Sequence, residues 1–99
     1  MKTGTALTQE AAEGLAIQAL TYLAEDPERL SRFLAVTGLA PEQIRAAARE
    51  PGFLAGVLEH LSADERMLTE FAGAAKIDPA EVGKALAVLG GGAIERETP

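Results

Sequence analysis

The sequence predicts an all-α fold, a compact bundle of about six short helices built from two similar three-helix units. Three observations support this prediction. The 99 residues include 20 Ala and 13 Leu but only four Ile, four Val and three Phe, a composition that favours helices over strands. Apolar residues recur at helical spacing between helix start and stop signals. The whole pattern returns after a shift of 38 residues.

The first helix is expected over residues 9–24, with Thr8 as its N-cap. Its apolar stripe consists of Ala12, Leu15, Ala16, Ala19, Leu20 and Leu23. The second helix begins at Asp26 and Pro27, because Asp is a good N-cap and Pro at the first helical position gives up an N–H group that has no helical partner. It ends at Gly38, which suits a left-handed cap. Its inward residues are Leu30, Phe33, Leu34 and Thr37.

The third helix opens at Pro41 and ends before Pro51, and its inward residues are Ile44, Ala47 and Ala48. The fourth helix follows with Phe53, Leu54, Val57, Leu58 and Leu61 facing inward. Ser62 and Glu65 then have the spacing of a capping box, in which the N-cap hydroxyl and the Glu carboxylate each accept a hydrogen bond from a free backbone N–H group. A fifth helix is therefore expected to begin at this capping box.

The fifth helix has the inward residues Leu68, Phe71, Ala72 and Ala75. Asp78 and Pro79 open the sixth helix, whose inward residues are Val82, Ala85, Leu86 and Leu89. Three glycines at positions 90–92 end it. We therefore expect one domain over residues 1–99, with a helical core at 8–89 and flexible tails at 1–7 and 90–99.

An internal repeat aligns residues 14–51 with residues 52–89 without a gap, and eight of the 38 aligned positions are identical. The identical positions include helix caps and inward-facing residues, such as Asp26 with Asp64, Phe33 with Phe71 and Pro41 with Pro79. Periodic helices rich in Ala and Leu align with themselves easily, which is the alternative explanation. Because two units cannot form a long solenoid, we expect them to share one core.

The composition excludes several classes of site and protein. Without Cys there is no disulfide, zinc–thiolate site or thiol nucleophile, and a single His excludes a multi-histidine metal cluster. A net charge of −6 argues against a general nucleic-acid binder. Gln9, Glu10 and Glu13 interrupt any apolar signal segment, and no run approaches the ~18 apolar residues of a membrane span. A cytoplasmic bacterial protein is therefore expected.

His60 is the residue with the clearest potential for acid–base chemistry, since it lies four residues before Asp64. A His–Asp pair acts as a general base only where it has a nucleophile or a bound substrate to serve. The nearby hydroxyl of Ser62 is already explained as a helix cap, and Glu59, His60 and Asp64 form a weak set of metal ligands. We therefore expect no catalytic residue, no metal and no cofactor.

The second and third helices, joined at Gly38, have the layout of a helix-turn-helix. The candidate contacts to nucleic acid on this layout are Arg29, Arg32, Gln43, Arg45 and Arg49. The first unit nevertheless has four basic residues against five acidic ones, whereas a DNA reader shows a strongly basic stripe. The alternative interpretation is a common helical corner with a solvated Arg face.

Four short runs indicate a known family: Glu-Asp-Pro-Glu-Arg-Leu at 25–30, Phe-Leu-Ala at 33–35, Thr-Gly-Leu at 37–39 and Pro-Gly-Phe-Leu-Ala at 51–55. On these runs, roughly residues 13–89 resemble domain-of-unknown-function family 3572, a group of short proteins found mainly in alphaproteobacteria. The resemblance implies a small stand-alone cytoplasmic protein. It implies no activity, cofactor or catalytic residue.

The lack of reactive groups favours a non-enzymatic helical protein that interacts with another protein or with a second copy of itself. A chain of this length buries only ~65% of its surface on folding, so an apolar face can remain exposed. The candidate contacts are apolar residues off the inward stripes, namely Ile17 and Met67, with Val36 and Val88 slightly better suited to the core. The alternative is a helix-turn-helix-like nucleic-acid-binding regulator that uses the second and third helices.

Overall fold

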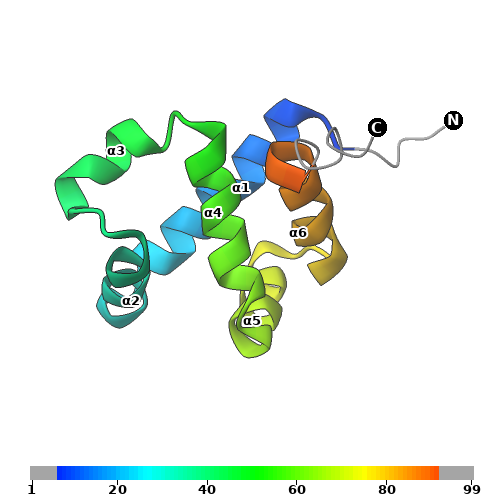
Figure 1. The fold of residues 1–99 in the computed structure, drawn as a ribbon. Coiled ribbons are helices and arrows are strands. Elements are labelled where there is room, and N and C mark those ends of the chain that lie inside the picture. The colour runs from blue at the N-terminus through cyan, green and yellow to red at the C-terminus, as the bar shows by residue number, and fades with distance from the viewer. Residues whose placement is uncertain (1–6, 92–99) are drawn as a thin grey trace, which may run out of the picture.

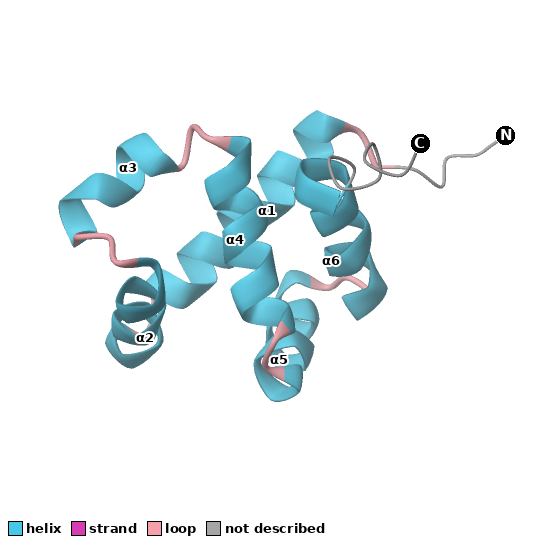
Figure 2. Ribbon diagram, in the orientation of Figure 1, coloured by secondary structure: helices cyan, strands magenta, loops and turns pink. Residues whose placement is uncertain are grey.

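The computed structural model describes residues 7–91, and within them every regular element is a helix (Figures 1 and 2). The main helices are α1 (Gln9–Ala24), α2 (Pro27–Thr37), α3 (Ile44–Ala47), α4 (Pro51–Ser62), α5 (Glu65–Ala75) and α6 (Pro79–Leu86). The radius of gyration of 13.5 Å is close to the ~13 Å of a compact 100-residue domain. The predicted all-α fold is therefore confirmed.

The helices begin where capping side chains meet free backbone N–H groups. Thr8 Oγ1 accepts a hydrogen bond from Ala11 N at 3.0 Å, and α1 has the predicted bounds. Asp26 and Asp78 each accept a bond from the second helical N–H group, at 2.9 Å, with a proline directly after each cap. These caps explain why the sequence located α1, α2 and the start of α6 correctly.

The start of α5 differs from the predicted capping box. Ser62 is the last residue of α4, so it does not cap the next helix. Asp64 takes that place, with an extended backbone and a carboxylate oxygen that accepts a hydrogen bond from Met67 N at 3.1 Å. A carboxylate at a helix N-terminus also interacts favourably with the helix dipole, and an uncharged Ser hydroxyl lacks this charge–dipole interaction.

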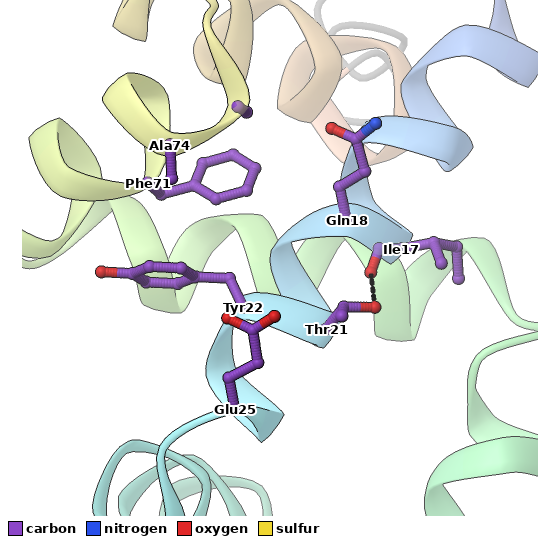
Figure 3. Close-up of a pocket in the computed structure, with 8 residues that line it drawn as sticks. Ile17, Gln18, Thr21, Tyr22, Glu25, Phe71 and Ala74 are labelled. Carbon is purple, nitrogen blue, oxygen red and sulfur yellow. Dashed lines mark hydrogen bonds between the residues drawn. The ribbon is translucent and has the colours of Figure 1, made fainter.

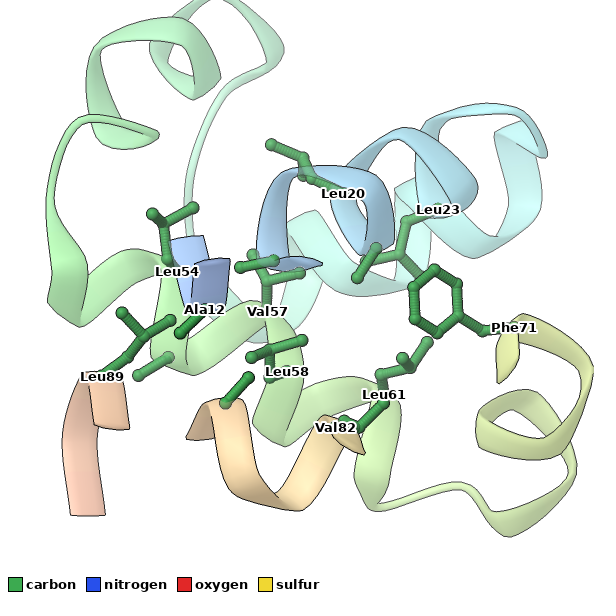
Figure 4. Close-up of a cluster of buried hydrophobic side chains, with 14 of the residues drawn as sticks. Ala12, Leu20, Leu23, Leu54, Val57, Leu58, Leu61, Phe71, Val82 and Leu89 are labelled. Carbon is green, nitrogen blue, oxygen red and sulfur yellow. The ribbon is translucent and has the colours of Figure 1, made fainter. Parts of the chain in front are cut away.

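The core forms where α1, α4 and α6 pack together, with α2 and α5 closing one end (Figures 1 and 4). Its largest fully buried side chains are Phe33, Leu23, Leu58, Leu61, Val57 and Val82. Figure 4 shows Leu20 and Leu23 of α1 on one side of the α4 residues Leu58 and Leu61, with Phe71 near their end. Most inward residues expected for α1, α4, α5 and α6 are buried, while Leu30 and Leu34 of α2 are half-buried and Thr37 is exposed.

The third helix is shorter and more exposed than predicted. It consists of a 3-10 turn over Pro41–Gln43 followed by a single α-helical turn, and Ile44, Ala47 and Ala48 are only half-buried. Ala40 offers no capping oxygen, unlike Asp78 at the start of α6, and Gln43 Oε1 accepts the Ala40 N–H bond instead, at 2.7 Å. The weak cap and the few apolar residues leave α3 at the edge of the fold.

The C-terminal end of the described chain continues α6 into a π-helical turn over Ala87–Gly91. Within it, Gly90 lies so close to α4 that a Cβ atom there would be 3.0 Å from Ala55 Cβ. At the other end, Leu7 packs against the core. The remainder of the predicted tails, residues 1–6 and 92–99, lies outside the described residues.

The 38-residue shift relates several helix boundaries. It maps α2 onto α5 at both ends and the end of α1 onto the end of α4. The residues after α2 and α5, Gly38 and Lys76, both have positive φ, at 77° and 60°. The third helices differ, because α6 contributes buried residues to the core and α3 contributes none. The division into two similar three-helix units stays a prediction.

Between residues 7 and 91 the structure has no helix that combines the length and apolar character needed to cross a membrane.

Candidate functional site

An open pocket of about 380 Å³ lies between α1 and α5 and is named here the α1–α5 groove (Figure 3). Its lining residues are Ile17, Gln18, Thr21, Tyr22, Glu25, Phe71, Ala74 and Ala75. They come from about the last two and a half turns of α1, including the cap residue Glu25, and from about the last one and a half turns of α5. Most of the surface they form is apolar, with a few polar side chains from α1.

Tyr22 is the most connected side chain of the groove. Its ring meets Phe71 edge-on at 5.5 Å between centroids, and its hydroxyl donates a hydrogen bond to Glu70 Oε1 at 3.1 Å. The guanidinium carbon of Arg29 lies 4.1 Å from the centre of the same ring. Burial raises the pKa of Tyr22, and the hydrogen bond to Glu70 adds to the rise while Arg29 opposes it. The hydroxyl therefore stays protonated near neutral pH and serves as a donor.

A second pocket of about 310 Å³ continues the groove along α1. The two pockets share Gln18 as a lining residue. The other lining residues of the second pocket are Leu7, Ala11, Gly14, Leu15, Ile77 and Glu81. Together the two pockets follow one face of α1 from its first turn to its end.

His60 lies away from the groove, against the core. Its ring meets the ring of buried Phe33 edge-on at 5.2 Å between centroids. Burial lowers the pKa of His60, the Arg32 guanidinium lowers it further, and Asp64 acts in the opposite direction. Within residues 7–91 the structure places no three His, Cys, Asp or Glu side chains so that they could hold a metal ion. The geometry therefore gives His60 a packing role.

The candidate nucleic-acid contacts fall into two groups. Arg29 is fixed against α1, since its Nη1 donates to the backbone oxygen of Tyr22 at 3.1 Å and its Nε lies 3.8 Å from Asp26 Oδ2. The Gln43 side chain is occupied by its bond to Ala40 N. Arg32, Arg45 and Arg49 are exposed. With α3 reduced to one turn, residues 39–50 do not form the long second helix that reads the major groove in a helix-turn-helix.

A family model described as "Protein of unknown function (DUF3572)" matches residues 9–92. The chain belongs to this family. The matched region runs from the first residue of α1 to just beyond the π-helical turn, so it covers every described helix. Neither the curated proteins nor the solved structures contain a significant match to the chain.

In this DUF3572 protein the apolar candidate contacts lie in different environments. Ile17 is 40% exposed and lines the α1–α5 groove. Met67 and Val88 are half-buried and pack against the core. Val36, expected to suit the core, is 70% exposed at the end of α2. Among the described large apolar residues, only Ile17 and Val36 are exposed to this degree.

Sequence reasoning singled out Ile17 but missed the residues around it. Tyr22, Gln18 and Thr21 lie on the flank of α1 outside the predicted apolar stripe, and Phe71 was assigned only to the core. The available signal was the position of Tyr22, an amphipathic residue one helical turn after Gln18 and close in sequence to Ile17. What could not be seen from the sequence was that α5 crosses this flank of α1.

Proposed function

We propose that this DUF3572 protein is a non-enzymatic interaction module that binds another protein through the α1–α5 groove. The observation that carries the proposal is the exposed Ile17 side chain beside an apolar groove, since contiguous exposed apolar surface marks interaction sites whereas single exposed apolar side chains are common. Val36 provides a comparison, because it is more exposed than Ile17 but lines neither of the described pockets.

The two hydroxyl groups of the groove already make hydrogen bonds that suit structure better than catalysis. The Thr21 hydroxyl donates to the Ile17 backbone oxygen at 3.0 Å, as Figure 3 shows, and the Tyr22 hydroxyl donates to Glu70. A nucleophile needs a base within hydrogen-bond reach that takes its proton. A tyrosine with a raised pKa is a poor base or nucleophile near neutral pH, which supports a binding role.

The proposal is tested by capture from a nuclease-treated lysate of the source organism. Tagged wild-type protein is compared with Ile17→Asp in the groove and with Val36→Asp as the matched control, since both place a carboxylate at an exposed apolar position. We expect the same partner protein on the wild type and Val36→Asp and its loss from Ile17→Asp. A partner retained equally by all three proteins, or none captured above a bare-resin control, would overturn the proposal.

A further inference from the structure

Building on the proposed function, we propose that the occupant of the α1–α5 groove is an amphipathic helix of a partner protein, with aliphatic side chains on one face flanked by Lys or Arg. The shape of the groove, its small side chains and its charge each point to this occupant.

The shape of the groove fits a helix. Its walls are the helices α1 and α5, and the described residues contain no strand whose edge could pair with an extended peptide. Together with the second pocket, it follows α1 from Ala11 to Glu25, a length of about 20 Å at 1.5 Å per residue. A partner helix of about four turns would match this length and place an apolar side chain on the groove at each turn.

Small side chains allow the partner to approach closely. Ala74 and Ala75 lie on the α5 side of the groove beside Phe71, and Ala11 and Gly14 lie on the α1 side of the second pocket. The interaxial distance of packed helices falls with the size of the side chains between them. Ile17, Tyr22 and Phe71 then supply the larger apolar surface that the partner's aliphatic residues cover.

The charge around the groove favours a basic partner. Glu25 lines the groove, Glu81 lines the second pocket, and Glu70 is held beside the groove by the Tyr22 hydroxyl. Neither pocket has a described Lys or Arg in its lining. The neighbouring cations are Arg29, which lies near Asp26, Lys84, whose Nζ is 3.5 Å from Glu81 Oε2, and Lys76, which follows Ala75. Two of these cations are thus paired with carboxylates, which leaves Glu25 and Glu70 against Lys76. The local balance is therefore acidic, in a chain of net charge −6, so a basic helix would be attracted and oriented.

Two designed peptides of about 18 residues, long enough to form helix, test this occupant. They share one Leu face, and the polar face is Lys in the first and Glu in the second. Calorimetric titration into the full chain should show binding of the Leu/Lys peptide and at least about tenfold weaker binding of the Leu/Glu peptide. Ile17→Asp should weaken binding of the Leu/Lys peptide by about tenfold or more, and Val36→Asp should leave it unchanged.

The role of charge is tested by the double variant Glu25→Gln and Glu70→Gln, in which the amide oxygen introduced at position 70 can still accept the Tyr22 hydrogen bond. This variant should bind the Leu/Lys peptide more weakly and with a smaller dependence on salt concentration. Circular dichroism checks the fold of each variant. If Ile17→Asp unfolds, Ala74→Arg at an exposed groove position gives the same test, because it both fills the groove and repels the Lys face.

Equal binding of the two peptides, or equal binding of the Leu/Lys peptide to the wild type and the groove variants, would overturn the inference. A pure wild-type dimer in light scattering that Ile17→Asp dissociates would also overturn it, because the occupant would then be a second copy. If a lysate partner depends on Ile17 but neither peptide binds, the occupant's chemistry is wrong while the proposed function stands.

Discussion

The ends of α2 and α5 offer a sharp test of how residue type affects stability at two positions that share a left-handed backbone conformation. Gly38 has φ 77° and its N–H group donates to Leu34 O at 2.8 Å, which is the simple left-handed helix cap. Lys76 has φ 60°, and here Lys76 N donates to Gly73 O while Ile77 N donates to Ala72 O, the two bonds of a Schellman motif. Thus α2 ends at a glycine, which is suited to the left-handed conformation, and α5 ends at a lysine, which is strained in it.

Exchanging the residue types should change stability in opposite directions. A non-glycine residue in the left-handed region costs about 1–2 kcal/mol, and glycine loses about 0.4–1 kcal/mol to the greater freedom of its unfolded chain. A Cβ atom at Gly38 would meet nothing within 4 Å, so the backbone conformation alone sets its cost. Gly38→Ala should therefore lower the free energy of unfolding by about 0.5–1 kcal/mol, and Lys76→Gly should raise it by a similar amount.

Thermal unfolding followed by circular dichroism measures both changes, since about 1 kcal/mol corresponds to 4–8 °C in a domain of this size. Gly83→Ala is the matched control: Gly83 lies inside α6 without a positive φ, and its added Cβ would have open space, so this variant should be more stable. The reasoning is refuted if Gly38→Ala is as stable as Gly83→Ala, or if Lys76→Gly melts below the wild type.

Three further predictions concern the core, the π-helical turn and pH. Phe33→Ala, which removes a fully buried ring in contact with Phe53 and His60, should cost about 3–5 kcal/mol in urea unfolding; a loss below about 1 kcal/mol would contradict the packing described. Gly90→Ala should lower the melting temperature, because its Cβ would press on Ala55, and an increase would show that the π-helical turn does not lie against α4. The folded chain holds the pKa of His60 below its ordinary 6.5, so just below that pH the unfolded chain binds more protons than the folded chain does. The contribution of His60 to the free energy of unfolding is therefore complete above pH 6.5 and is lost as the pH falls. Urea unfolding between about pH 8 and 5 should show a steeper loss of unfolding free energy for the wild type than for His60→Gln, and parallel pH dependences would refute this role of His60.

The helix pattern could be predicted from the sequence wherever local signals were unambiguous. Thr8, Asp26 and Asp78 are caps that act within one turn, so their effect is written in neighbouring residues. Ser62 and Asp64 are both residue types that cap helices. Which of them caps α5 depends on how far α4 continues, and the packing of α4 against the core decides that. The prediction that α3 is buried was wrong for the same reason, because apolar spacing does not show whether another helix lies opposite.

The candidate site was harder to predict, because it depends on two helices that are far apart in the sequence. Ile17 was recognised as an apolar residue off the inward stripe, which needs only helical periodicity. The partnership of Tyr22 with Phe71 and Glu70 joins α1 to α5 across about 48 residues, and no local pattern specifies it. Conversely, Arg29 and Gln43 looked available from the sequence but are occupied by contacts within the fold.

The central claim, that the α1–α5 groove is the binding surface, is tested most directly by an amide chemical-shift map of the ¹⁵N-labelled full chain titrated with the Leu/Lys peptide. The largest changes are predicted over residues 17–25, at the end of α1 and its cap, and over residues 71–75 of α5, and at the same peptide concentration they should be much smaller in Ile17→Asp. Changes centred on Arg45 and Arg49, or spread evenly over the acidic surface, would contradict the account.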